Sequence, residues 1–158
     1  MEYPYPELRA AMNNTQPVGK EKTMVTIKDL KGELGKLRTL EGRTPETPES
    51  AREGAFARLA NYRDGGIFAA KFSGESSWER HPNGDEIVQI VEGATVLHLM
   101  TDEGPQSITL TEGMIAIVPQ GTWHRFVAPD GVGLVTATPQ PTQHLTFAID
   151  DPRTLDQR

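Results

Sequence analysis

Cysteine is absent from this 158-residue chain, which excludes disulfide bonds and thiolate metal ligands. An excess of basic residues is missing as well, since 16 Lys and Arg stand against 22 Asp and Glu, for a net charge of -6. A nucleic-acid surface needs a positive stripe that neutralises phosphates. We therefore expect no nucleic-acid partner.

Long apolar runs are also missing. No stretch reaches the roughly 18 consecutive apolar residues that a bilayer-spanning helix requires. The first residues lack the apolar core of a signal peptide. We expect no membrane partner and a cytoplasmic location.

The length allows one domain with a core and an appendage. Residues 1–50 are predicted to be an N-terminal arm and a linker. Residues 1–23 are rich in Pro, Asn, Gln and charge, which predicts an extended arm, and the prolines, threonines and charges of 41–52 predict a linker loop. Leucines at 30, 34 and 37 have helical spacing, but Gly32 and Gly35 weaken a helix. This stretch therefore predicts either one short helix or an edge strand.

Residues 51–150 read as short strands at regular spacing, and residues 151–158 as a polar tail. Turn residues such as Asp64-Gly65 separate the strands. The pattern predicts an all-β fold, an antiparallel double-stranded barrel or jelly roll. Besides two strands within 78–93, the predicted strands are 56–62, 66–72, 95–100, 106–110, 114–118, 123–128, 134–138 and 145–149.

Residues 78–93 carry the first cluster of polar groups. Glu79 and His81 share one strand face because side chains alternate. A turn over 82–85 follows, and Glu86 then opens an apolar strand. A carboxylate at the head of an apolar face needs a partner, since burying a bare charge costs several kcal/mol. His81 is a candidate partner, and a metal ion would satisfy both.

A second segment, 113–124, is a strand, a Pro-x-Gly turn and a new strand that carries His124. The two segments together resemble the two sequence motifs of the cupin superfamily. The second half of the first motif (H-x4-E-x6-G) falls on His81, Glu86 and Gly93. The residues that match the second motif (G-x5-P-x-G-x2-H) are Gly113, Pro119, Gly121 and His124.

Two positions depart from the motifs: Glu79 stands where the first motif has its first His, and Ala128 where the second ends in Asn. The resemblance implies a double-stranded β-helix barrel with one divalent transition metal, Zn, Fe, Mn, Ni or Cu. His81, Glu86 and His124 would be ligands, and Glu79 a fourth ligand, a general base or an exposed residue. The alternative is a metal-free, hydrogen-bonded polar cluster.

Four further residues are candidates for the substrate pocket. Phe126 shares a strand face with His124, and Val88 shares one with Glu86. His98 and Met100 share a face of a third strand.

Two aromatic and two basic residues are expected on the outer face, opposite the ligands beside them, and His144 in a solvated loop; the outer-face residues are Trp78, Arg80, Trp123 and Arg125.

The resemblance implies a small-molecule ligand inside the barrel and a homodimer. As an enzyme the protein would be a metal-dependent dioxygenase, isomerase or hydrolase. The alternative is a non-catalytic cupin that binds or senses a small molecule.

Overall fold

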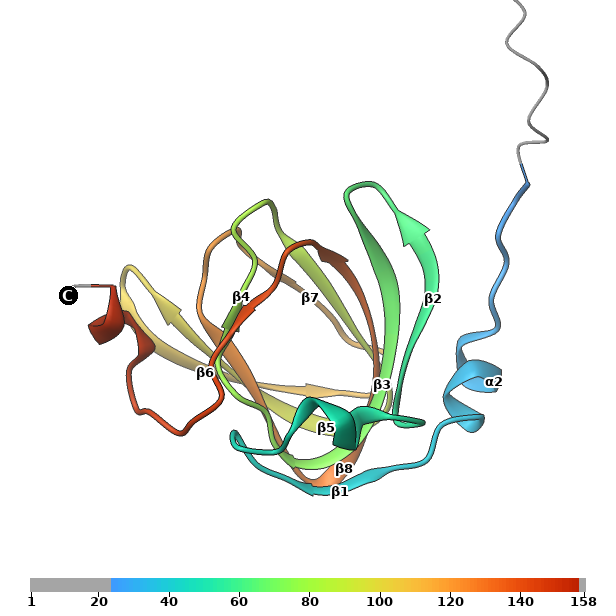
Figure 1. Cartoon of the computed structure of the whole chain (residues 1–158), viewed down its shortest axis with the longest axis horizontal. Coiled ribbons are helices and arrows are strands. Elements are labelled where there is room, and N and C mark those ends of the chain that lie inside the picture. The colour runs from blue at the N-terminus through green and yellow to red at the C-terminus, as the bar shows by residue number, and fades with distance from the viewer. Residues whose placement is uncertain (1–23, 157–158) are drawn as a thin grey trace, which may run out of the picture.

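The computed structural model describes residues 24–156, so the predicted arm over 1–23 and the last two residues of the tail lie outside the described residues. Nine strands in this part of the chain form one curled sheet, which confirms the all-β barrel (Figure 1). The strands are β1 Leu40–Arg43, β2 Phe56–Tyr62, β3 Gly65–Glu75, β4 Glu79–Arg80, β5 Glu86–Thr101, β6 Gly104–Thr111, β7 Ile115–Val118, β8 His124–Pro139 and β9 Gln143–His144. The helical elements are α2 Leu30–Gly35 and the 3₁₀ turns η1 Glu49–Arg52 and η2 Pro152–Leu155.

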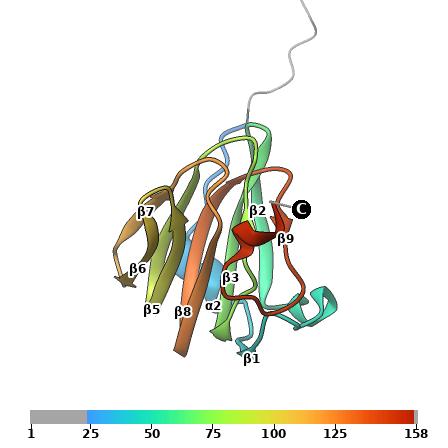
Figure 2. The same ribbon diagram turned by 90° about the vertical axis from the view of Figure 1, so that its left-hand side faces the viewer.

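Two long antiparallel strands, β5 and β8, run through the whole barrel (Figure 2). The sequence predicted two shorter strands in place of each. The chain instead continues through Gly93 and Gly131, both at positive φ, where a side chain would be strained. A Cβ on Gly93 would also clash with the carbonyl oxygen of Gly131. These glycines therefore let both strands bend together, and the sheet curls.

The core fills the inside of the barrel with inward-facing side chains of β3, β5 and β8, such as Phe72, Leu97 and Leu134. A smaller cluster packs α2 onto the outside through Leu34, which is fully buried. No helix in residues 24–156 is long and apolar enough to cross a membrane.

The predicted linker loop over 41–52 is wrong in part, because β1 lies parallel to β3. Ser73 holds the two strands together: its hydroxyl accepts from the amide of Gly42 (3.0 Å) and donates to Glu41 Oε2 (2.7 Å). Its partners are far apart in the chain, so no local pattern announces the pairing.

The predicted strand 145–149 is wrong as well. Only Gln143–His144 pairs with β4, and the chain then leaves the sheet. The Trp78 indole donates to the carbonyl of Ile149 (2.8 Å) and holds this segment outside the ladder. The tail that follows forms η2 and binds Arg80 through Asp156 (2.7 Å).

Candidate metal centre

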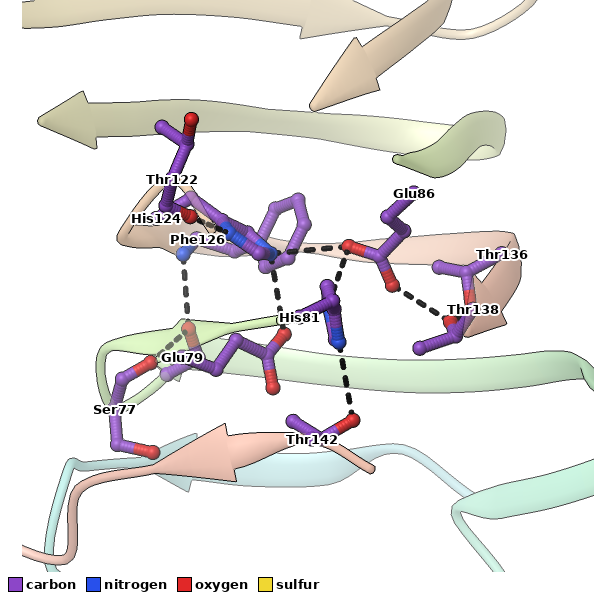
Figure 3. A network of polar contacts seen from close by, with 11 residues as sticks. Ser77, Glu79, His81, Glu86, Thr122, His124, Phe126, Thr136, Thr138 and Thr142 are labelled. Atoms are coloured by element: carbon purple, nitrogen blue, oxygen red, sulfur yellow. Dashed lines mark hydrogen bonds and ion pairs between the residues drawn. The ribbon is translucent and has the colours of Figure 1, made fainter. Parts of the chain in front are cut away.

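Four residues from three strands and one turn meet inside the barrel. Glu79 lies on β4, His81 follows it, Glu86 begins β5 and His124 begins β8. One ligand atom of each lies within 4.8 Å of the ligand atoms of the others (Figure 3). Glu79 and His124 are direct neighbours because β4 pairs with β8 at these residues. The structure thus brings together all four ligands that the sequence suggests.

The turns that carry these residues are fastened to each other. The amide of Gln120 donates to Asp85 Oδ1 (2.8 Å) and its side chain donates to the carbonyl of Pro82 (2.6 Å). The amide of Gly121 donates to the carbonyl of His81 (2.9 Å). The two motif turns therefore form one unit, which sets the distance between the ligands on either side.

Glu86 is the centre of the cluster. Its Oε2 lies 3.0 Å from His124 Nε2 and 3.2 Å from His81 Nε2. Glu79 Oε1 lies 3.6 Å from His124 Nε2. The side chains of His81, Glu86 and His124 are at most 3% exposed, whereas that of Glu79 is 24% exposed. Glu79 is therefore the most exposed member of the cluster.

Each imidazole is oriented by an oxygen outside the cluster. His124 Nδ1 donates to the carbonyl of Thr122 (3.0 Å), and His81 Nδ1 lies 3.2 Å from the hydroxyl of Thr142, which can accept its proton. Both Nε2 atoms then face inward, as metal-bound imidazoles do. His81 Nε2 is buried and, among residues 24–156, has no partner in hydrogen-bonding geometry. An inward lone pair of this kind fits a metal ion.

Glu86 is oriented in the same way. Its Oε1 accepts from the hydroxyl of Thr138 (2.6 Å), which lies 2.6 Å from that of Thr136. The other oxygen, Oε2, is left to the two imidazoles. Two nitrogen and two carboxylate ligands form a mixed donor set that suits zinc, iron, manganese, nickel or copper.

The charges in the cluster depend strongly on one another. Burial by itself would raise the pKa of Glu86, but the hydrogen bond from His124 and the close approach of His81 outweigh it and lower the pKa to about 2. Burial would likewise lower the pKa of His124, but Glu79 and Glu86 together raise it to about 10. Without a metal, His124 therefore holds a proton between two carboxylates. A divalent cation would replace that proton.

A cavity of about 340 Å³ opens beside the cluster. Glu79, His81 and Glu86 line it, and Phe126 contributes a ring that meets the His124 ring edge-on at 5.9 Å between centroids. This is near the lower end of the volume range for small-molecule pockets.

Three of the predicted pocket residues lie elsewhere. His98 and Met100 are on the outer face of β5, because Leu97 and Leu99 take the inward positions. His98 instead lies 2.7 Å from the Ser107 hydroxyl on β6. Val88 does point inward, but it is fully buried in the core and does not line the cavity.

The four expected outer-face residues lie outside the cavity. The Arg80 guanidinium stacks over the Trp123 ring (4.5 Å) and that of Arg125 over the Trp78 ring (5.1 Å). Arg125 also pairs with Glu75 on the neighbouring strand (3.1 Å).

Sequence reasoning missed several residues of the cavity wall. His144 is exposed as expected, yet it lines the cavity because it pairs with Glu79 across β9 and β4. Arg43 and Arg52 come from the segment that was predicted to be a linker. Their sequence neighbourhood carries no motif that would single them out. Three threonines of the cavity wall were missed as well: Thr138 contacts Glu86, Thr142 contacts His81, and Thr136 contacts Thr138.

The comparisons with known proteins agree with this fold. The sequence model of the cupin domain family matches residues 69–135. A solved structure of a protein from Neisseria meningitidis is 23% identical, with a TM-score of 0.54, and the match covers 72% of this chain and 99% of that one. No curated protein matches this chain.

Two other solved structures are similar over about half of this chain. A cupin-2 domain protein from Shewanella frigidimarina is 26% identical over 54% of this chain and 79% of its own, with a TM-score of 0.46. Hydroquinone 1,2-dioxygenase from Sphingomonas, with 4-hydroxybenzoate bound, is 20% identical over 54% of this chain and 65% of its own, with a TM-score of 0.47.

Proposed function

We propose that this chain is a cupin that binds one divalent transition-metal ion through His81, Glu86 and His124 and takes a small organic molecule into the adjoining cavity. The observation that carries the proposal is the orientation of the two imidazoles. Both direct Nδ1 to an oxygen outside the cluster and Nε2 toward Glu86 Oε2. A metal-free polar cluster has no need to leave a buried Nε2 without a hydrogen bond.

The three buried residues form the inner ligand set, and Glu79 completes it on the cavity side. The exposure of Glu79 suits a ligand that can be displaced, or a base that takes a proton from a bound molecule. Its pKa is lowered, because contacts with His124 outweigh burial and the charge of Glu86, so Glu79 is ionised at neutral pH.

A metal ion bound here would act as a Lewis acid toward an oxygen of the bound molecule or would bind dioxygen. The residues of the chain supply the rest. Glu79 is placed to move a proton at the cavity face, and Phe126 excludes water from one side of His124. Dioxygenation, isomerisation and hydrolysis are all compatible with this arrangement.

Metal analysis of the purified protein tests the proposal. We expect near-stoichiometric transition metal in the wild type and its loss in the double variant His81→Ala/His124→Ala. The matched control is His98→Ala, which removes an imidazole on the outer face and should leave metal content unchanged. Equal metal content in wild type and double variant would refute metal binding through His81 and His124.

Oxygen consumption separates an oxygenase from a binding protein. The Fe(II)-loaded protein would be followed with phenols, diketones and thiols as candidate substrates. Uptake that depends on His81 and His124 would identify an oxygenase. If no oxygen is consumed with any of the three classes, isomerisation, hydrolysis or binding without turnover would be favoured.

A further inference from the structure

The cavity contains a buried cation that the metal centre does not use. Arg43, the last residue of β1, is 8% exposed and lines the same cavity as Glu79, His81 and Glu86. Its guanidinium carbon lies 4.8 Å from the centre of the Phe72 ring and 5.2 Å from that of Phe56. Within residues 24–156 this side chain makes no hydrogen bond and no ion pair. A buried charge without a partner is costly, so the position calls for an anion.

The backbone holds Arg43 firmly at this place. It pairs with Gly74 of β3, which has a φ of 96°. A Cβ on Gly74 would clash with the carbonyl oxygen and the amide of Arg43. Glycine at this position therefore lets β1 approach β3 closely enough to bring the guanidinium into the cavity.

A second arginine lines the cavity near Arg43, and both stack over the Phe56 ring. Arg52, at the end of η1, is half-buried, lines the cavity and stacks over the Phe56 ring at 5.4 Å. Arg38 fastens η1 from the other side, because its guanidinium donates to the carbonyls of Ala51 (2.5 Å) and Glu53 (2.9 Å). One exposed carboxylate, Glu49, also lines the cavity.

These charges leave the cavity positive once a divalent ion offsets Glu79 and Glu86. Arg43 and Arg52 then contribute two positive charges against the single negative charge of Glu49. Burial lowers the pKa of Arg43 to about 10, and the charge of Glu79 acts in the opposite direction. Arg43 is therefore charged at neutral pH.

We propose that Arg43, backed by Arg52, binds the carboxylate group of the substrate, so that the cavity takes small organic carboxylates. This inference rests on the proposed function, since it names the substrate class of the same site. A guanidinium presents two parallel N–H groups that match a carboxylate, and a cavity of about 340 Å³ admits a small acid. Phe56 and Phe72 border the guanidinium and offer apolar surface to the body of the molecule.

The competing explanation is that Arg43 serves only to balance the charge of Glu79. The two side chains form no ion pair within 4.0 Å, so this balance would act at longer range. A balancing role predicts that removing Arg43 changes metal affinity. A binding role predicts that removing Arg43 changes how the protein distinguishes an acid from its amide.

The experiment measures that distinction on zinc-loaded full-length protein by titration calorimetry at low salt. The probes are acid and amide pairs of the same shape: acetate and acetamide, lactate and lactamide, benzoate and benzamide, salicylate and salicylamide. We expect at least one acid to bind about tenfold or more tightly than its amide, as a hydrogen bond to a charged group allows. Arg43→Met should abolish the preference, and Arg43→Lys should keep part of it.

Arg63→Met is the matched control, because Arg63 is an exposed arginine that stacks on Tyr62 outside this cavity. It removes the same charge and should leave the preference intact. If no acid binds better than its amide, including the case in which nothing binds, the carboxylate proposal is overturned. Zinc content, measured in every sample, reports separately on the metal site: wild type without zinc would refute the proposed function instead.

Discussion

Raising the pH of the metal-free protein should destabilise it, because His124 holds a proton that the unfolded chain does not. The pKa of His124 is about 10 in the folded protein and 6.5 in the unfolded reference. Between these values the folded state binds one proton more than the unfolded state. The contribution of this proton to the free energy of unfolding is fully present below pH 6.5, and it is lost as the pH rises through the folded pKa of about 10.

The slope amounts to about 1.4 kcal/mol per pH unit for one proton. Between pH 7.5 and 9.0 the loss is therefore about 2 kcal/mol, and the midpoint of thermal unfolding should fall by roughly 4–8 °C. This window lies below the pKa of about 10 of Arg43, whose loss of a proton would change the slope in the opposite direction.

Urea unfolding of chelator-treated protein at several pH values measures the slope. His124→Gln should lower stability at pH 7.5 and flatten its dependence on pH. His98→Gln, which removes a half-buried imidazole from the outer face, should keep the slope of the wild type. A wild-type stability that stays flat from pH 7.5 to 9.0 would refute the proton shared by His124, Glu79 and Glu86.

Three further outcomes are expected. Thr138→Val removes the hydroxyl that donates to Glu86, so it should weaken zinc binding by about 10–100-fold. The control Thr109→Val, on the exposed face of β6, should leave the zinc affinity unchanged. Competition with a chromophoric chelator measures both affinities. Glu86→Gln should abolish metal retention during purification while Glu79→Gln keeps it, since only Glu86 is buried between both imidazoles; equal losses would make Glu79 an equal ligand. The homodimer stays a prediction. Ile87, Ile115 and Ile117 lie beside one another on β5 and β7 and are 38%, 63% and 64% exposed, so they form an apolar patch that a second copy could cover. Light scattering should give twice the mass of one chain for the wild type and the mass of one chain for Ile117→Lys.

The sequence predicted which four side chains come together in the candidate metal centre, because the evidence for their positions is local. Alternation along a strand places Glu79 and His81 on one face, and turn residues mark where Glu86 and His124 begin new strands. The pocket predictions at His98 and Met100 failed for a related reason. Alternation says that two residues share a face, but it does not say which face is inward, and here Leu97 and Leu99 bury more apolar surface.

The cavity wall could not be predicted because long-range pairing builds it. The segment around Arg43 lacks apolar alternation, so its composition indicates a loop, and only its parallel pairing with β3 makes it a strand. The merging of short strands into β5 and β8 depends on long-range contact in the same way, because Gly93 and Gly131 approach each other where the two strands bend.

The two halves of the site therefore have different origins in the chain. The four proposed metal ligands all lie within the region that matches the cupin domain, residues 69–135, whereas Arg43 and Arg52 precede it. In the proposed function, the metal centre and the charge of the cavity can then change separately, because a substitution in β1 or η1 alters that charge without touching a proposed ligand. Two proteins that share both motifs can thus differ in the molecules they bind, and the segment before the matched region is where that difference should be sought.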